Sequence, residues 1–208
     1  MTNVLIVDSA ATGEASVTRR LTAELEAVLR GRGPVRIVHR DVGSSPVPHL
    51  TAETTPAIRG AEAETDSARD AIALSDALIA ELKAADLLVI GAPMYNFGMP
   101  STLKAWFDHV LRAGITFRYS EAGPEGLLQG KKAIVVESRA GLYSEGPSSA
   151  MDSQEPHLRT LLAFMGIDDM SFVRVEKLAF GPEAAAESIA EAIERLRGLA
   201  IEELPLAA

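Results

Sequence analysis

The chain has 208 residues, of which 47% are hydrophobic, a formal net charge of −9 and no cysteine. This length fits one domain, which we expect to span residues 1–208, and the composition is that of a folded protein. The absence of cysteine excludes disulfides and thiol chemistry and is compatible with a reducing cytoplasm, where we expect the protein. Because the chain is acidic and no apolar run reaches the ~20 residues of a membrane span, we expect neither nucleic acid nor a membrane as a partner. The first residues also lack the basic segment of a signal peptide.

Short β-rich runs alternate with amphipathic helical patterns along the chain. The first half predicts a buried strand at residues 4–7, a helix from Ser16 to about residue 30, an edge strand at 35–38, a long loop at 41–65, a helix at about 66–84 and a central strand at 87–90. The second half predicts a helix at 103–111, a long insertion at 114–131, a strand at 133–136, a helix at 158–165, a strand at 172–175 and a helix at about 189–199.

Five strands alternating with five helices predict an α/β fold, in which helices cover both faces of a parallel sheet. In such sheets ligands bind at the carboxyl ends of the strands, near the point where the strand order reverses. We therefore expect the binding loops after the first, third and fourth strands, at residues 9–17, 92–100 and 138–147.

The loop after the first strand contains neither a dinucleotide fingerprint nor a phosphate-binding P-loop. It does offer the hydroxyls of Ser9, Ser16 and Thr18 at the start of a helix, where free backbone N–H groups favour a phosphate. The alternative is that Ser16 only caps the helix, and for this loop taken alone that is the stronger interpretation.

The loop after the third strand carries Tyr95 and Phe97 between two prolines, Pro93 and Pro100. A planar heterocycle needs such an apolar or aromatic wall with a few fixed backbone donors. Tyr95 and Phe97 could equally be core aromatics. In the loop after the fourth strand, Gly141 would let the backbone approach a ligand, although a plain turn is the simpler interpretation there.

Other chemistries find little support in the sequence. The four histidines are scattered without metal-ligand spacing, so we expect no metal, and the nucleophile elbow of serine hydrolases is missing.

Several segments together carry a family resemblance. They are residues 92–97, 103–104, 107–108, 112–119, 123–127, 130–133, 138–139, 166–167 and 181–183. In this order, and over nearly the whole chain, they resemble the family of FMN-dependent NADH:quinone oxidoreductases and azoreductases.

The resemblance implies a flavodoxin-like, doubly wound, five-stranded parallel sheet, a bound FMN and a homodimer. It implies that Ser9, Ser16, Val17 and Thr18 hold the phosphate. The loop of Pro93, Met94, Tyr95, Asn96 and Phe97 would lie along the isoalloxazine ring, and Ser138, Arg139, Ala140 and Gly141 would contact its pyrimidine side. Tyr119, Tyr143 and Leu161 would border the substrate pocket, with Tyr119 reaching over the flavin of the partner subunit. The chain departs from the family pattern at Ala10, Ala140 and Leu161.

The implied activity is the two-electron reduction of quinones and the reductive cleavage of azo compounds, with NADH or NADPH as donor and ping-pong kinetics. No side chain is assigned as a general acid, because the chemistry belongs to the cofactor. Two alternatives stay open: an electron carrier that does not react with NADH or NADPH, and an α/β module without flavin.

Overall fold

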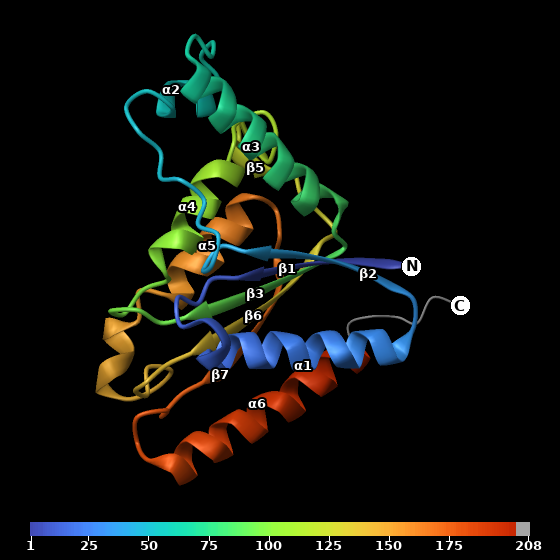
Figure 1. Ribbon diagram of the computed structural model, residues 1–208, viewed down its shortest axis with the longest axis vertical. Helices are drawn as coiled ribbons and strands as arrows, with labels where there is room; N and C mark the ends of the chain where they lie inside the picture. Colours follow the sequence, from blue (N-terminus) through green and yellow to red (C-terminus); the bar gives the residue numbers. More distant parts are fainter. Residues whose placement is uncertain (203–208) are drawn as a thin grey trace.

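The computed structural model describes residues 1–202 and has a single central sheet (Figure 1). Residues 203–208 of the expected domain lie outside the described part. The strands are β1 (Thr2–Asp8), β2 (Val35–Asp41), β3 (Leu87–Pro93), β4 (Phe117–Ser120), β5 (Gly123–Gly126), β6 (Lys132–Ser138) and β7 (Asp169–Val175). The helices are η1 (Gly13–Ala15), α1 (Val17–Arg32), α2 (Thr55–Ile58), α3 (Asp66–Ala84), α4 (Ser101–Val110), η2 (Pro147–Met151), α5 (Glu155–Phe164) and α6 (Pro182–Glu202).

The central sheet is parallel and has the strand order β2-β1-β3-β6-β7, which confirms the expected flavodoxin-like topology. The apolar run after Asp86 forms the middle strand, β3, and every residue of β3 is buried. The strand order reverses between β1 and β3, whose ends pair at Asp8 and Gly91, and the next pair ends at Pro93 and Ser138. The loops that leave β1, β3 and β6 therefore emerge side by side.

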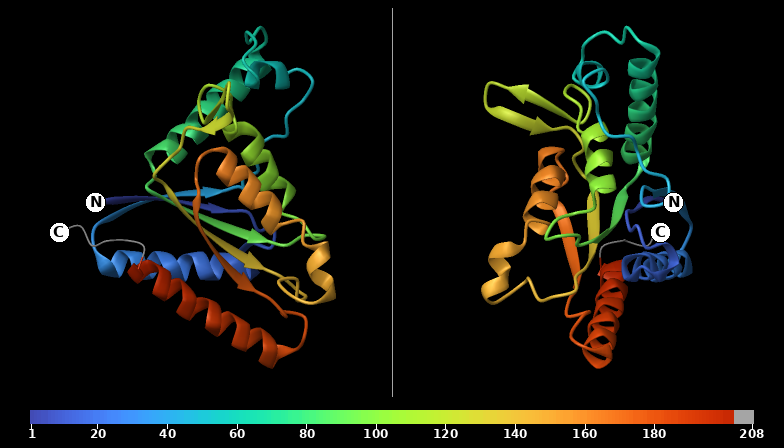
Figure 2. Two further views of the ribbon diagram at one scale, coloured as in Figure 1. Left: turned by 180° about the vertical axis from the view of Figure 1, so that it is seen from behind. Right: turned by 60° about the vertical axis from the view of Figure 1, so that its left-hand side comes forward.

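Helices cover the two faces of the sheet unequally (Figures 1 and 2). On one face α1 and α6 pack their leucines against Val4, Ile6 and Val89. On the other face α3, α4 and α5 bury a larger cluster that includes Trp106 and Phe107. Strands covered on both sides need continuous apolar sequence, which is why β1, β3 and β6 lack strict alternation. Within residues 1–202, no helix has both the length and the apolar character needed to cross a membrane.

The insertion at residues 114–131 was expected to be a loop, but it contains a two-stranded antiparallel ribbon, β4–β5. The ribbon stands away from the sheet, as the right-hand view of Figure 2 shows. It is attached at its base, where a Cβ on Gly126 would lie 2.0 Å from the backbone nitrogen of Gly166. Two glycines thus allow two backbones to touch. The sequence pattern missed the ribbon because its strands are short and rich in glycine and proline.

Candidate functional site

A cavity of about 300 Å³ opens at the carboxyl ends of β1, β3 and β6. It is lined by Thr12, Ala15, Ser16, Val17, Pro93, Met94, Tyr95, Ser138, Arg139, Ala140, Leu178 and Ala179. The three loops expected from the sequence therefore meet in one place. The fourth wall, Leu178 and Ala179, follows β7 and was missed, although the end of the fifth strand had to lie at this same edge.

The first loop ends at a helix start that suits an anion. Ser16 is extended and caps α1, and its hydroxyl accepts a hydrogen bond from the Arg19 backbone and lies 3.0 Å from the Thr18 hydroxyl. The N–H groups of Val17 and Thr18 belong to the first helical turn and have no hydrogen-bond acceptor within residues 1–202. Ser16 is a helix cap, as the simpler interpretation held, and the capped turn also brings Val17, with its free N–H group, into the lining of the cavity.

Ser9 and Thr18 are both fully buried at the base of the first loop. The Ser9 hydroxyl donates to the Gly91 carbonyl at 2.7 Å, so it joins β1 to β3. Ala10, one of the departures from the family pattern, is 1% exposed, and its carbonyl accepts a hydrogen bond from Arg19. These residues fix the backbone path of the loop.

Arg19 braces the same loop from behind, which the sequence pattern did not predict. Its guanidinium forms two hydrogen bonds of 2.5 Å with the Asp41 carboxylate at the end of β2. The Arg19 hydrogen bonds lower the pKa of Asp41 to about 2, so this pair stays ionised at neutral pH. Gly43, two residues further on, packs against the Ala10 backbone so closely that a side chain does not fit.

The second loop is a strained turn. Asn96 and Phe97 have φ of 48° and 70°, a conformation that is rare for a bulky residue such as Phe97. Tyr95 and Gly98 close the turn by exchanging backbone hydrogen bonds of 2.9 and 3.1 Å. Phe97 is 40% exposed, so it is not a core aromatic. Strain of this kind persists where the surrounding structure holds it and concentrates at binding sites.

Tyr95 connects the second loop to the first. Its hydroxyl accepts a hydrogen bond of 3.0 Å from the Ala11 backbone N–H, and its side chain lines the cavity. The Met94 N–H donates to the Ser138 carbonyl at 2.8 Å, which connects the second loop to the third. The three loops therefore form one hydrogen-bonded frame.

The third loop depends on a glycine. A Cβ on Gly141 would lie 3.0 Å from the Tyr143 ring, so the ring occupies the space that a side chain would take. That ring meets Phe97 edge-on, with 6.0 Å between the ring centres. Ser138 and Ala140 line the cavity, whereas the Arg139 guanidinium is fully buried among carboxylates.

The residues expected at the substrate pocket lie apart from one another. Tyr143 is near the cavity through its contact with Phe97. Leu161 is partly buried and packs against the larger core cluster. Tyr119 lies on the β4–β5 ribbon, is 73% exposed and touches Phe117 of the same ribbon. Within one subunit the structure therefore does not bring Tyr119 or Leu161 into the cavity.

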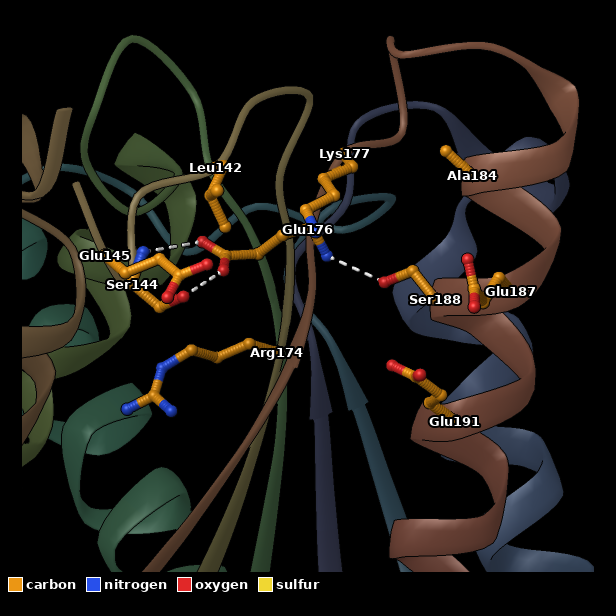
Figure 3. Close-up of a pocket in the computed structure, with 10 residues that line it drawn as sticks. All are labelled: Leu142, Ser144, Glu145, Arg174, Glu176, Lys177, Ala184, Glu187, Ser188 and Glu191. Atoms are coloured by element: carbon orange, nitrogen blue, oxygen red, sulfur yellow. Dashed lines mark hydrogen bonds between the residues drawn. The ribbon is translucent and has the colours of Figure 1, made fainter. Parts of the chain in front are cut away.

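A second hollow of about 390 Å³ lies beyond the third loop, between the end of β7 and α6 (Figure 3). Four carboxylates line it, from Glu145, Glu176, Glu187 and Glu191. The cavity at the strand ends differs in charge, because no acidic residue lines it although the whole chain carries −9. Arg174 and Lys177 also line the second hollow, so its carboxylates outnumber its cations by two, whereas a dianionic phosphate meets no carboxylate in the lining of the cavity at the strand ends.

Comparisons with known proteins agree with this geometry. Residues 2–199 match the family model described as a flavodoxin-like fold. The chain is 53% identical over 190 residues to an FMN-dependent NADH:quinone oxidoreductase of Hyphomonas neptunium, covering 91% of each chain. It is 48% identical to a protein of the same name from Azotobacter vinelandii, covering 96% of this chain and 100% of the other. The crystal structure of an azoreductase from Bacillus anthracis superposes with a TM-score of 0.88 at 28% identity, covering 96% of this chain and 99% of that one.

Proposed function

Since the chain belongs to the flavodoxin-like family of FMN-dependent NADH:quinone oxidoreductases, we propose that it binds FMN at the strand ends and reduces quinones and azo compounds with NADH or NADPH. One observation carries the assignment of the site. The cavity combines free N–H donors at the start of α1 with a lining that contains no carboxylate. A phosphate-bearing cofactor is stabilised by both features.

FMN, when bound, supplies two-electron transfer between a nicotinamide and a second substrate. The residues of this chain hold and orient it. The Val17 amide and the Ser16 hydroxyl line the cavity and would bind the phosphate, while the buried Thr18 and Ser9 would support that contact from behind the lining. The apolar and aromatic wall of Pro93, Met94 and Tyr95 would lie along the ring, with the turn at Asn96 and Phe97 shaping its far end.

Ser138, Ala140 and the backbone of Gly141 would form the opposite wall, next to the apolar Leu178 and Ala179. Such a wall excludes water from one side of the site, which strengthens electrostatic interactions inside it. Within residues 1–202, the cavity lining offers no histidine or carboxylate as a proton donor. The residues therefore act by positioning, and no catalytic side chain is assigned.

We propose that the nicotinamide and the second substrate occupy one shared cavity beside the bound FMN in turn, which gives ping-pong kinetics. Initial rates measured over a grid of NADH and quinone concentrations should give parallel double-reciprocal lines. Intersecting lines would contradict a shared cavity. The same rates with NADPH in place of NADH identify the preferred donor.

The site is completed by a second copy of the chain in this proposal. Tyr119 is an exposed aromatic on the β4–β5 ribbon, which stands away from the sheet of its own subunit (Figure 2), and Phe97 is a second exposed aromatic, in the loop after β3. Exposed aromatics of this kind are typical of interfaces. Sedimentation velocity should find a dimer. A monomer that holds FMN at full occupancy would refute this part of the proposal.

The test of the function is a visible spectrum of the purified protein under anaerobic conditions, before and after NADH is added. A yellow protein that NADH bleaches supports the oxidoreductase. For such an enzyme we propose a cytoplasmic location. A yellow protein that neither NADH nor NADPH bleaches is an electron carrier. A colourless protein that does not bind added FMN would overturn the proposal.

A further inference from the structure

Arg139 stands at the centre of a buried cluster directly behind the cavity. Its side chain is 0% exposed. Its guanidinium nitrogens lie 2.8 Å from Glu137, 3.0 Å from Asp152, 3.2 Å from Glu176 and 3.7 Å from Glu155. A guanidinium so enclosed is fixed in place by its planar fork of donors, and removing it would leave several buried acceptors unpaired.

Arg139 reaches the third loop through Glu176. The Glu176 carboxylate accepts hydrogen bonds from the backbone N–H groups of Tyr143 at 2.8 Å and Ser144 at 3.0 Å. It also accepts from the Ser144 hydroxyl (Figure 3). This places the Tyr143 ring against Phe97 of the second loop. The orientation of the Tyr143 ring therefore depends on a carboxylate that Arg139 holds.

Arg139 reaches the second loop through Gln154. The Arg139 Nε donates to the Gln154 side-chain oxygen at 3.3 Å, and the Gln154 amide nitrogen donates to the Ala92 carbonyl at 2.8 Å. Ala92 directly precedes Pro93, where the second loop begins to line the cavity. The neighbouring Ser153 N–H also donates to the Phe97 carbonyl, at 3.0 Å. Both walls of the cavity are thus connected to one side chain.

The carboxylates of the cluster are not equivalent. On α5, Glu155 pairs with Arg174 of β7 and with Arg159, while Asp152 accepts two backbone N–H groups at the start of that helix. Glu176 lies just after β7. Burial alone would raise its pKa, but hydrogen bonds from Ser144, Tyr143 and Arg139 outweigh burial and lower it.

Glu137 of β6 pairs with Arg139 alone, and its Oε1 has no hydrogen-bond partner within residues 1–202. Burial raises the pKa of Glu137 to about 8, with Glu155 and Asp152 adding to the rise and Arg139 opposing it. This rise favours the protonated form of Glu137, because Arg139 also faces the carboxylates of Asp152 and Glu176.

We propose that Arg139 is a positioning residue for the cofactor, which sets the distance between the two walls of the cavity through Gln154 and Glu176. Glu137 lies 2.8 Å from the Arg139 guanidinium, its Oε1 has no partner within residues 1–202, and it preserves this arrangement when it carries a proton. The inference deepens the proposed function and rests on it where FMN affinity is the readout. It gives the side chain of Arg139, which the sequence placed in the loop expected to contact FMN, an indirect role in that contact.

The first test compares Arg139→Met, Arg139→Lys and Arg159→Met. Arg159 also pairs with Glu155 but is about half exposed and touches neither loop, so it is the matched control. Quenching of FMN fluorescence by the apoprotein at pH 7 measures the dissociation constant. We expect the FMN dissociation constant to rise roughly tenfold or more for Arg139→Met. It should rise less for Arg139→Lys, because an ammonium lacks the planar fork of donors, and should hardly change for Arg159→Met. An Arg139→Met protein with the wild-type constant would overturn the inference.

The second test uses Glu137→Gln, which keeps the shape of the protonated acid. Between pH 7 and 9 the FMN dissociation constant of the wild type should rise more than that of the variant. Titration of FMN itself affects both proteins alike, so only their difference counts. Equal pH profiles for the two proteins would refute the role of the Glu137 proton.

A third measurement separates this inference from the proposed function. Amide hydrogen exchange of the apoprotein needs no FMN. Arg139→Met should speed exchange in residues 93–98 and 139–145 while leaving α1 unchanged. If the wild type fails to bind FMN, the function fails but the exchange result still decides whether Arg139 holds the loops. Unchanged exchange in both segments would refute the inference whatever FMN does.

Discussion

Gly43 provides the sharpest test of how the loop between β1 and α1, which we propose binds the phosphate, is held in place. It lies just after β2 and its N–H donates to the Asp8 carbonyl and to the Asp41 carboxylate. A Cβ at this position would lie 2.2 Å from the Ala10 carbonyl oxygen and 2.8 Å from its carbon. Gly43→Ala therefore drives a methyl group into the backbone of the loop that precedes α1.

The size of the effect follows from that distance. Ordinary contact begins at 3.4 Å, so the Ala10 backbone has to move by roughly 1 Å in a region packed as densely as a crystal. Overpacking of this kind costs about 1–3 kcal/mol. Because Ala10 also accepts a hydrogen bond from Arg19, the shift is transmitted toward the Ser16 end of the loop. We expect weaker FMN binding as well as lower stability.

Gly31→Ala is the matched control, because it adds the same methyl group within α1 where nothing lies within 4 Å. Alanine is the better helix former, so this change should raise the free energy of unfolding by about 0.5–1 kcal/mol. Urea unfolding of the apoprotein and FMN titration measure the two quantities. The reasoning would be refuted if Gly43→Ala left both the unfolding free energy and the FMN dissociation constant at wild-type values.

Three further changes test the frame around the cavity. Ser16→Ala removes the cap of α1 and a hydroxyl at the cavity, so urea unfolding should show an unfolding free energy about 1 kcal/mol lower, and FMN should bind more weakly. An unchanged FMN affinity would contradict the phosphate assignment. Tyr95→Phe leaves the Ala11 N–H without its acceptor and should lower the unfolding free energy by about 0.5–1.5 kcal/mol in the same assay. An unchanged unfolding free energy would show that the two loops do not depend on this hydrogen bond. Glu137→Gln should flatten the dependence of stability on pH between about 5 and 8, as measured by urea unfolding across that range.

The sheet could be predicted because each strand is determined by residues that are close together in the sequence. Strands buried on both faces need continuous apolar runs, and the runs at residues 4–7 and 87–90 became the buried strands β1 and β3. The helix capped by Ser16 began where the sequence placed it. The edge position of β2 also followed from its weaker pattern. In each of these elements the residues that decide the structure are close together in the sequence.

The frame of the site was not predictable, because it depends on contacts between distant residues. Asp41 is 22 residues from Arg19, and Tyr95 is 84 residues from Ala11. The sequence placed Arg139 in one of the loops that line the cavity, but the pattern could not show which carboxylates surround its side chain. Tyr119 and Leu161 were expected at the substrate pocket from resemblance alone, and within one subunit they lie elsewhere.

The effect of Glu137 on stability changes with pH in a direction that separates it from the effects of the other titrating groups. The pKa of Glu137 rises from 4.5 to about 8 on folding, so the folded state binds the proton more tightly than the unfolded state does. Its contribution to stability is complete below pH 4.5 and is lost as the pH rises through 8, by at most about 1.4 kcal/mol per pH unit.

Burial lowers the pKa of His109, so His109 acts in the opposite direction, and its contribution to stability grows as the pH rises toward 6.5. Asp41, with its pKa lowered to about 2, matters only in acid. The difference in unfolding free energy between wild type and Glu137→Gln removes both of these contributions, and it should turn against the wild type as the pH rises. A difference that stays constant from pH 5 to 8 would mean that Glu137 is ionised in the folded protein and that the Arg139 cluster is balanced without a proton.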